Sequence, residues 1–209
     1  MTQRIWERIE QSRERWNVLR HPFYRRWSAG DLSRQELARY SGQYRQAVRA
    51  IAAASEAAAE IAPERPELRR HAVEERDHVA LWDGFVEAAG GCAADGPTPE
   101  TEECVRAWSD SLAVQAGGDG LLGRLVRLYA IESGQPEISR IKRQGLVDHY
   151  GFIEGQGTAY FRLHERRDTE HAAEARELIE ELAAQSDEDD LAAGAEAVLR
   201  ANWRLLDGV

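Results

Sequence analysis

The segment HERRDTEH, residues 164–171, places two histidines and an aspartate within eight residues of a chain that has only six histidines. On an α-helix, positions i, i+4 and i+7 fall on one stripe, so His164, Asp168 and His171 project in the same direction. The charged residues between them point elsewhere. Such a stripe is either a chelating face or a buried polar cluster. The segment therefore predicts a long helix that carries a polar site on one face.

Composition indicates the class of fold around this helix. The chain has 209 residues, of which 43% are hydrophobic and 31% are charged, enough for one sizeable core but short for two full domains. Ala, Glu, Leu and Arg are abundant, which favours helix, and no useful run alternates apolar and polar residues. The sequence predicts an all-α bundle of seven to nine helices in a single domain, residues 1–209.

Several short signals mark where these helices begin and end. Ser33 and Glu36 have the spacing of a capping box and open a long predicted helix. Thr98, followed by Pro99, predicts another helix start. Near Pro136, a glycine and the proline predict a hinge between two helices.

Charge and hydropathy exclude several functional classes. The net charge of −10 argues against a nucleic-acid-binding surface. The longest alanine-rich run, AVRAIAAASEAAAEIA, is broken by Arg49, Glu56 and Glu60 and so is not expected to cross a membrane. The first residues lack the apolar core of a signal peptide. Cys92 and Cys104 lack the spacing of a metal finger or redox motif. We expect a cytoplasmic protein without membrane or nucleic-acid partners.

Further ionisable residues stand beside apolar helical stretches. Glu75 and His78 have E-x-x-H spacing, and Glu132 ends a mostly apolar run. His71 lies two turns before His78 and is expected to be at most a neighbour of the site. Carboxylates and imidazoles without thiolates suit iron or manganese, and a dinuclear site in a helical bundle needs about six ligands. The predicted ligands are Glu75, His78, Glu132, His164, Asp168 and His171.

Each of these groups also has an ordinary interpretation. Glu75, or its neighbour Glu74, can pair with arginines on a solvated face. His164 and Asp168 can form a buried hydrogen-bonded pair, and Glu132 can pair with a nearby arginine. For any group taken alone the ordinary interpretation is favoured. The occurrence of all three groups in one chain favours the metal site.

Longer segments carry a resemblance to a known family. HPFYRRWSAGDLSRQELARYSGQY, EERDHVALWDGFVEAAG, YAIESGQPEISRIKRQGLVDHYG and GTAYFRLHERRDTEH resemble the haem-oxygenase-like superfamily, which includes TenA and pyrroloquinoline quinone synthase. Within it the chain resembles the CADD-like branch of dimetal oxidases. The resemblance runs from about His21 to His171. It implies a TenA-like bundle, two metal ions (Fe/Fe or Fe/Mn), O2 and an external reductant as co-substrates, and a homodimer.

The resemblance also implies roles for particular residues. The metal-ligand pattern of the branch falls on the six residues named above, but the compact EERDH segment departs from relatives with a longer insertion and leaves Glu74 as a rival to Glu75. CADD-like proteins are implicated in p-aminobenzoate synthesis for folate, with their own tyrosine as ring source and a lysine as amino donor. Tyr24 and Lys142 match these two positions.

Two further positions bear on the chemistry that the resemblance implies. Tyr160 matches a pocket tyrosine of the family, whereas Ile131 stands where some relatives have a tyrosine before the metal-binding glutamate. We expect a self-sacrificing p-aminobenzoate synthase. A dimetal oxidase acting on an external amino acid or fatty acid, or a non-enzymatic protein-binding module, remain alternatives.

Overall fold

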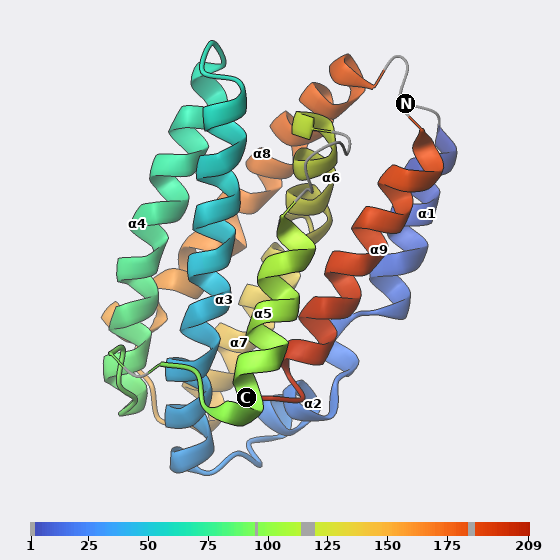
Figure 1. Ribbon diagram of the computed structural model, residues 1–209. Coiled ribbons are helices and arrows are strands. Elements are labelled where there is room, and N and C mark those ends of the chain that lie inside the picture. Colours follow the sequence, from blue (N-terminus) through green and yellow to red (C-terminus); the bar gives the residue numbers. More distant parts are fainter. Residues whose placement is uncertain (1–2, 95, 114–119, 184–186) are drawn as a thin grey trace.

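In a computed structural model, residues 3–94, 96–113, 120–183 and 187–209 are described, and they form nine α-helices and no strand (Figure 1). The all-α prediction of seven to nine helices is confirmed. The helices are α1 (Gln3–Arg15), α2 (Pro22–Ala29), α3 (Arg34–Ile61), α4 (Pro66–Ala89), α5 (Pro99–Leu112), α6 (Gly120–Glu132), α7 (Gln135–His149), α8 (Ala159–Leu182) and α9 (Glu188–Leu205).

Several helices begin and end at residues that are typical of helix ends. The Ser33 hydroxyl accepts a hydrogen bond from the backbone N–H of Glu36, and the Glu36 carboxylate accepts one from the backbone N–H of Ser33, which completes the capping box of α3. Pro66 lies in the first turn of α4, and Gly90 ends that helix at φ 75°, a left-handed conformation that favours glycine. The hinge near Gly134 separates α6 from α7.

The helices pack into a bundle in which α3 and α4 run side by side and α9 lies between α1 and α5 (Figure 1). Helix α8 contacts α4, α6 and α7, and α3 contacts α4, α5 and α6. The largest fully buried side chains include Trp27, Trp82, Trp108, Phe85 and Phe161, which belong to one continuous apolar core. Because α4 and α6 both pack on α8, their polar residues are brought together inside the bundle.

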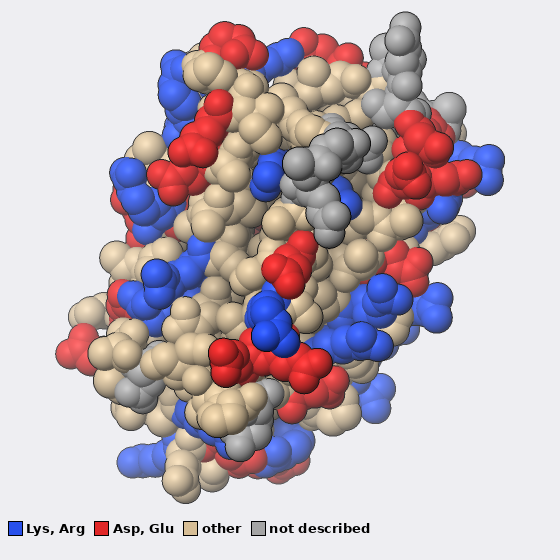
Figure 2. Space-filling model, viewed as in Figure 1, with Lys and Arg blue, Asp and Glu red and all other residues tan. Residues whose placement is uncertain are grey.

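Charged side chains of both signs lie on the surface of the bundle. On the face shown in Figure 2, acidic and basic side chains are interspersed among the described residues. Among the described helices, none combines the length and the apolar character that crossing a bilayer requires.

The capping box provides a test of the fold. We expect Ser33→Ala to lower the free energy of unfolding by about 1 kcal/mol, because a backbone N–H at the start of α3 loses its acceptor. Chemical denaturation of the metal-free protein measures the change. Ser28→Ala, at an exposed position in the last turn of α2, is the matched control and should leave stability nearly unchanged. Equal stability of the two variants would contradict the capping role.

Candidate metal centre and tyrosine–lysine pocket

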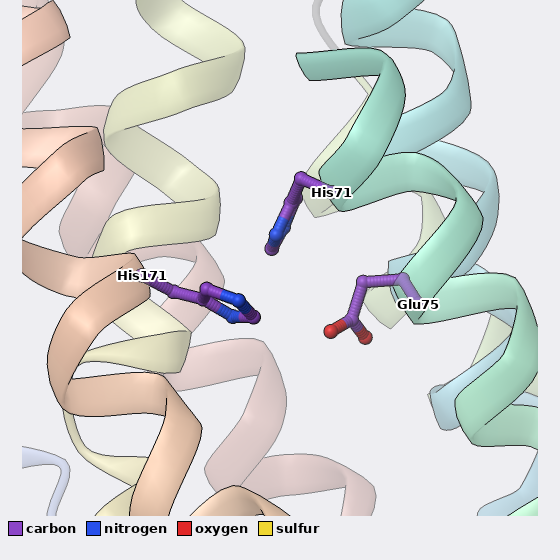
Figure 3. A group of neighbouring side chains, drawn as sticks. All are labelled: His71, Glu75 and His171. Carbon is purple, nitrogen blue, oxygen red and sulfur yellow. The ribbon is translucent and has the colours of Figure 1, made fainter. Parts of the chain in front are cut away.

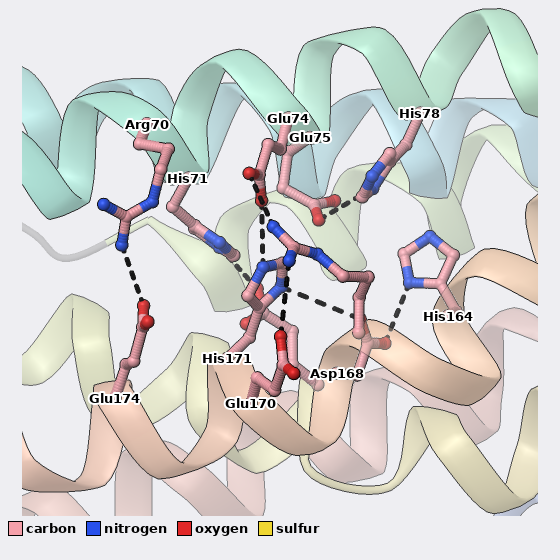
Figure 4. A network of polar contacts seen from close by, with 12 residues as sticks. Arg70, His71, Glu74, Glu75, His78, His164, Asp168, Glu170, His171 and Glu174 are labelled. Atoms are coloured by element: carbon pink, nitrogen blue, oxygen red, sulfur yellow. Dashed lines mark hydrogen bonds and ion pairs between the residues drawn. The ribbon is translucent and has the colours of Figure 1, made fainter.

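All six residues predicted as metal ligands are buried, with at most 8% of their surface exposed. They lie on α4, α6 and α8, three helices that meet in the core. Figure 4 shows the imidazoles and carboxylates of α4 and α8 facing one another across the space between these helices. The structure therefore brings the predicted residues together. They are Glu75, His78, Glu132, His164, Asp168 and His171.

The stripe on α8 follows the expected helical spacing. His164 Nδ1 lies 2.8 Å from Asp168 Oδ2, in a buried hydrogen bond between residues one turn apart. His171 Nδ1 lies 3.8 Å from the other oxygen of Asp168, which is too long for a hydrogen bond. Asp168 therefore stands between the two imidazoles and orients the first of them.

Helix α4 presents its own acid and imidazole toward this stripe. His78 Nδ1 lies 2.9 Å from Glu75 Oε1, and both side chains are buried. Glu74 is 25% exposed and lies at the edge of the cluster, where it contacts His171 Nε2 at 2.9 Å and accepts a hydrogen bond from Arg167 at 2.9 Å. The sequence left Glu74 as a rival to Glu75. The structure places Glu75 within the cluster and Glu74 at its rim.

His71 is closer to the cluster than the sequence analysis expected. His71 Nε2 lies 3.2 Å from Glu132 Oε1, so this histidine links α4 to the acid at the end of α6. A signal for it was present in the sequence. HAVEERDH, residues 71–78, repeats the H-x-x-x-acid-x-x-H spacing of residues 164–171, with Glu75 as the acid.

Two groups of three side chains have the geometry to hold a metal ion. Within each group, the potential ligand atoms lie within 4.8 Å of one another. One group is His71, Glu75 and His171, whose side chains converge in Figure 3. The other is Glu75, His78 and His164. Glu75 belongs to both groups.

Three imidazole nitrogens in the cluster are buried without a hydrogen-bond partner. They are Nδ1 of His78, Nε2 of His164 and Nδ1 of His171. The short contact of His78 with Glu75 lacks hydrogen-bond alignment. Because an unpaired buried polar atom is costly, three such atoms among carboxylates require an explanation. Nitrogen and oxygen donors without thiolate fit iron or manganese, so these residues fit the metal that the resemblance implies.

Charge pairing shifts the acid–base properties of the cluster. Burial raises the pKa of Glu75, but the neighbouring imidazoles of His78, His164 and His71 together outweigh burial and hold that pKa well below its usual value. Burial lowers the pKa of His71, but the Glu132 carboxylate reverses this and raises it to about 9. Without metal, His71 is therefore protonated beside the Glu132 carboxylate. Metal binding to an imidazole requires its neutral form, so it competes with such protons.

A small cavity of about 50 Å³ borders the cluster. His71, Glu132 and His171 contribute to its lining, and most of the remaining lining is aliphatic, from α3, α4, α6 and α8. The cavity has room for a few atoms only.

A second buried group surrounds Lys142, of which only 3% is exposed. Its Nζ lies within 6.0 Å of the centroids of six aromatic rings and donates a hydrogen bond of 2.9 Å to the Tyr40 hydroxyl. The hydroxyls of Tyr40 and Tyr24 are 2.7 Å apart. The rings belong to Tyr24, Trp27, Tyr40, Tyr44, Trp82 and Phe161.

Burial changes the chemistry of Lys142 because none of the contacts described for it involves a carboxylate. Burial lowers the pKa of the amine from its usual 10.5 to about 7, so an appreciable fraction is neutral near neutral pH. The amine is also unique, because Lys142 is the only lysine in a chain with 26 arginines. The occurrence of a single lysine was the sequence signal for a buried role of Lys142. Its arginine neighbours, in contrast, suggested a cation on the surface.

Aromatic side chains connect the pocket around Lys142 to the histidine–carboxylate cluster. The Tyr160 ring lies 4.2 Å from the His164 ring and 4.9 Å from the Trp82 ring, centroid to centroid. The Trp82 ring is in turn 5.2 Å from Lys142 Nζ. Tyr160, which the resemblance singled out, therefore lies between the two groups. Tyr40, which the sequence analysis did not single out, joins Tyr24 to Lys142.

Comparison with known proteins identifies the family. Residues 70–203 match the family model described as iron-containing redox enzyme, with a haem-oxygenase-like fold, and the chain belongs to this family. The predicted family is thus confirmed, and the chain is an oxidoreductase. A TenA homologue from Pseudomonas syringae pv. tomato superposes with a TM-score of 0.81 at 20% identity, covering 99% of this chain and 90% of the other. The haem-oxygenase-like, TenA-like fold is confirmed.

Curated relatives share the sequence over most of its length. The 4-aminobenzoate synthase of Chlamydia trachomatis serovar D is 30% identical over 198 residues, which cover 91% of this chain and 85% of the relative. The 4-aminobenzoate synthase of Nitrosomonas europaea is 28% identical, with 92% and 85% covered.

The lowered pKa of Lys142 predicts an unusual dependence of stability on pH. Between pH 7 and 10.5 the unfolded chain holds the lysine proton and the folded chain does not, so stability rises with pH in that window. We expect Lys142→Met to stabilise the metal-free protein at pH 7. The gain should shrink by up to about 1.4 kcal/mol per pH unit toward pH 10.

Denaturation of parent and variant at pH 7, 8.5 and 10 measures the effect. Arg140→Met, at an exposed position on α7, is the control, and its stability difference should not vary with pH over this range. A pH-independent difference for Lys142→Met would show that the buried amine keeps its ordinary pKa.

Proposed function

We propose that this chain is a 4-aminobenzoate synthase that uses its own Tyr24 as the ring source and its own Lys142 as the amino donor. The reaction is an O2-dependent oxidation with an external reductant at a dinuclear Fe/Fe or Fe/Mn site. The small-molecule partners in this reaction are O2 and the reductant. A cytoplasmic location and a homodimeric state belong to the same proposal, and the homodimer rests on the resemblance alone.

One observation carries the proposal. The only lysine of the chain is buried against Tyr40, which shares a hydrogen bond with Tyr24, in the same core as the histidine–carboxylate cluster. A lysine kept only for charge or solubility has no reason to lie inside an aromatic cage, because burial disfavours its ammonium form. The relatives named 4-aminobenzoate synthase support the same activity.

The six buried ligand residues have the first role. Glu75, His78, Glu132, His164, Asp168 and His171 would hold the two metal ions, and their carboxylates balance part of the metal charge. When bound, the metals supply reduction of O2 and hence the oxidising power for the reaction. His164 is positioned for this role by Asp168, which holds one ring nitrogen and leaves the other free for a metal.

The tyrosine–lysine pocket manages protons and excludes water. Burial raises the pKa of Tyr24 well above its usual value, so its phenol stays protonated and must lose that proton when the ring is oxidised. Tyr40 lies between this phenol and the amine, so the proton has a path from Tyr24 Oη through Tyr40 Oη to Lys142 Nζ. A neutral amine can accept it or can use its lone pair as a nucleophile. The surrounding rings keep competing water away.

The volume of the cavity beside the cluster bears on the alternative of an external substrate. Pockets that hold drug-sized ligands usually measure roughly 300–1,000 Å³. The cavity beside His71, Glu132 and His171 measures about 50 Å³, far too small for a fatty acid. A ring and an amine already inside the protein need no such pocket, which favours the self-derived substrate.

Removal of the Tyr24 hydroxyl tests the ring source. We expect Tyr24→Phe to abolish 4-aminobenzoate formation, because the phenol oxygen lowers the oxidation barrier of the ring. Metal content should remain that of the parent, since Tyr24 lies outside the ligand cluster. Growth of a p-aminobenzoate auxotroph and product analysis by mass spectrometry measure the effect.

The matched control is Tyr129→Phe, at a buried tyrosine on α6 whose ring packs on Trp6 and is not among the six rings described around the lysine. It should complement the auxotroph as the parent does. Full complementation by Tyr24→Phe would remove Tyr24 as the ring source and favour an external substrate.

The single lysine allows an unambiguous test of the nitrogen source. Protein made with [ε-15N]lysine carries the label only at Lys142, so 4-aminobenzoate from that protein should be one mass unit heavier. Lys142→Arg should give no product, because a delocalised guanidinium is a poor amino donor. The double variant Lys142→Arg with Arg140→Lys keeps one lysine in the chain but places it on an exposed face, and it should also be inactive. Unlabelled product from the labelled parent would refute the role of Lys142.

A further inference from the structure

His71 repeats on α4 the position that His164 occupies on α8. His71, Glu75 and His78 are spaced i, i+4 and i+7, as are the histidines and aspartate of the α8 stripe, and the two helices pack against each other. Residues with this spacing share one helix face. The bundle therefore opposes two stripes with the same order of imidazole, carboxylate and imidazole.

The geometry makes His71 an equal member of the cluster. Its ligand atom lies within 4.8 Å of those of Glu75 and His171, the same limit that the group of Glu75, His78 and His164 meets. The His71 and His171 rings meet edge to face with centroids 5.0 Å apart. Figure 3 shows both imidazoles and the Glu75 carboxylate directed into one space.

The partner of His71 in this structure is consistent with that role. Its Nε2 contacts Glu132 at 3.2 Å, and Glu132 is itself among the proposed ligands. His171 has Nε2 held by Glu74 and a buried Nδ1 without a hydrogen-bond partner. His171 is thus held through one ring nitrogen by a carboxylate and free at the other, the usual arrangement of a metal ligand, and it is the histidine that faces His71.

We propose that His71 is a metal ligand in addition to the six residues named above, so that one ion has His71, Glu75 and His171 among its ligands and the other has Glu75, His78 and His164. This inference rests on the proposed metal-dependent function. It gives the site four imidazoles, where the sequence analysis expected three. Because neutral imidazole adds no charge, the additional ligand raises metal affinity without changing the charge balance of the site.

Cobalt(II) alone, added anaerobically to the full chain, is the probe. Each imidazole on paramagnetic cobalt carries one exchangeable ring N–H, which gives one strongly shifted proton signal. We expect two cobalt ions per chain and four such signals, from His71, His78, His164 and His171. His71→Gln should lose one signal and bind one of the two ions at least tenfold more weakly. Glutamine can still donate a hydrogen bond to Glu132, so loss of that bond does not explain the result.

Two further variants serve as the positive and the negative control. His78→Gln should also lose one signal, whereas His149→Gln, at an exposed histidine, should change neither signals nor stoichiometry. Three signals in the parent and the same three in His71→Gln would overturn the proposal and make His71 a partner of Glu132 only. Fewer than two cobalt ions in the parent would overturn it as well. The parent spectrum alone decides between four and three imidazoles if His71→Gln does not fold.

The measurement is separable from the proposed synthase activity. A parent that complements the auxotroph but shows three shifted signals refutes the role of His71 alone. A parent that binds two ions with four signals but makes no 4-aminobenzoate refutes the synthase function and leaves the ligand assignment standing.

Discussion

Carboxylates and imidazoles can stay buried inside a helical bundle only when they face one another or a metal. In this chain the requirement determines how α4 and α8 pack. Glu75 and Asp168 stand in the middle of opposed stripes, each flanked by imidazoles one turn away on either side. Any rotation of either helix would leave a carboxylate against aliphatic core, at a cost of several kcal/mol. The rest of the bundle is arranged around this polar layer.

The same core holds a second environment of opposite character. Around Lys142 the walls are aromatic and no carboxylate is among its described contacts, so the amine is pushed toward its neutral form. Around His71 the nearest partner is a carboxylate, so the imidazole is pushed toward its charged form. One protein thus keeps a partly neutral amine and a charged histidine–carboxylate cluster in the same core. Tyr160 and Trp82 form the boundary between them.

Much of this was readable in the sequence because helical periodicity is a local property. The spacing of His164, Asp168 and His171 predicted a shared face, and the capping box at Ser33 predicted the start of α3. Which faces meet across the bundle is a property of tertiary packing, and local spacing does not encode it. The spacing of residues 71–78 carried a local signal for His71, but only the packing of α4 on α8 shows that His71 faces His171. Tyr40 gave no signal of its own, because a tyrosine in an apolar helix is ordinarily core.

The two environments are in contact through aromatic rings that do not include position 131. Ile131 is buried next to Glu132 and provides no aromatic ring on the α6 side of the cluster. On the α8 side, the Tyr160 ring packs 4.2 Å from that of His164, and Trp82 continues the contact to Tyr40 at 6.0 Å. Closely spaced rings, from Tyr160 through Trp82 to Tyr40, therefore connect the histidines to the hydrogen-bonded hydroxyls of Tyr40 and Tyr24. Because this series of rings avoids position 131, the absence of a tyrosine there does not isolate the buried tyrosine and lysine from the histidine–carboxylate cluster.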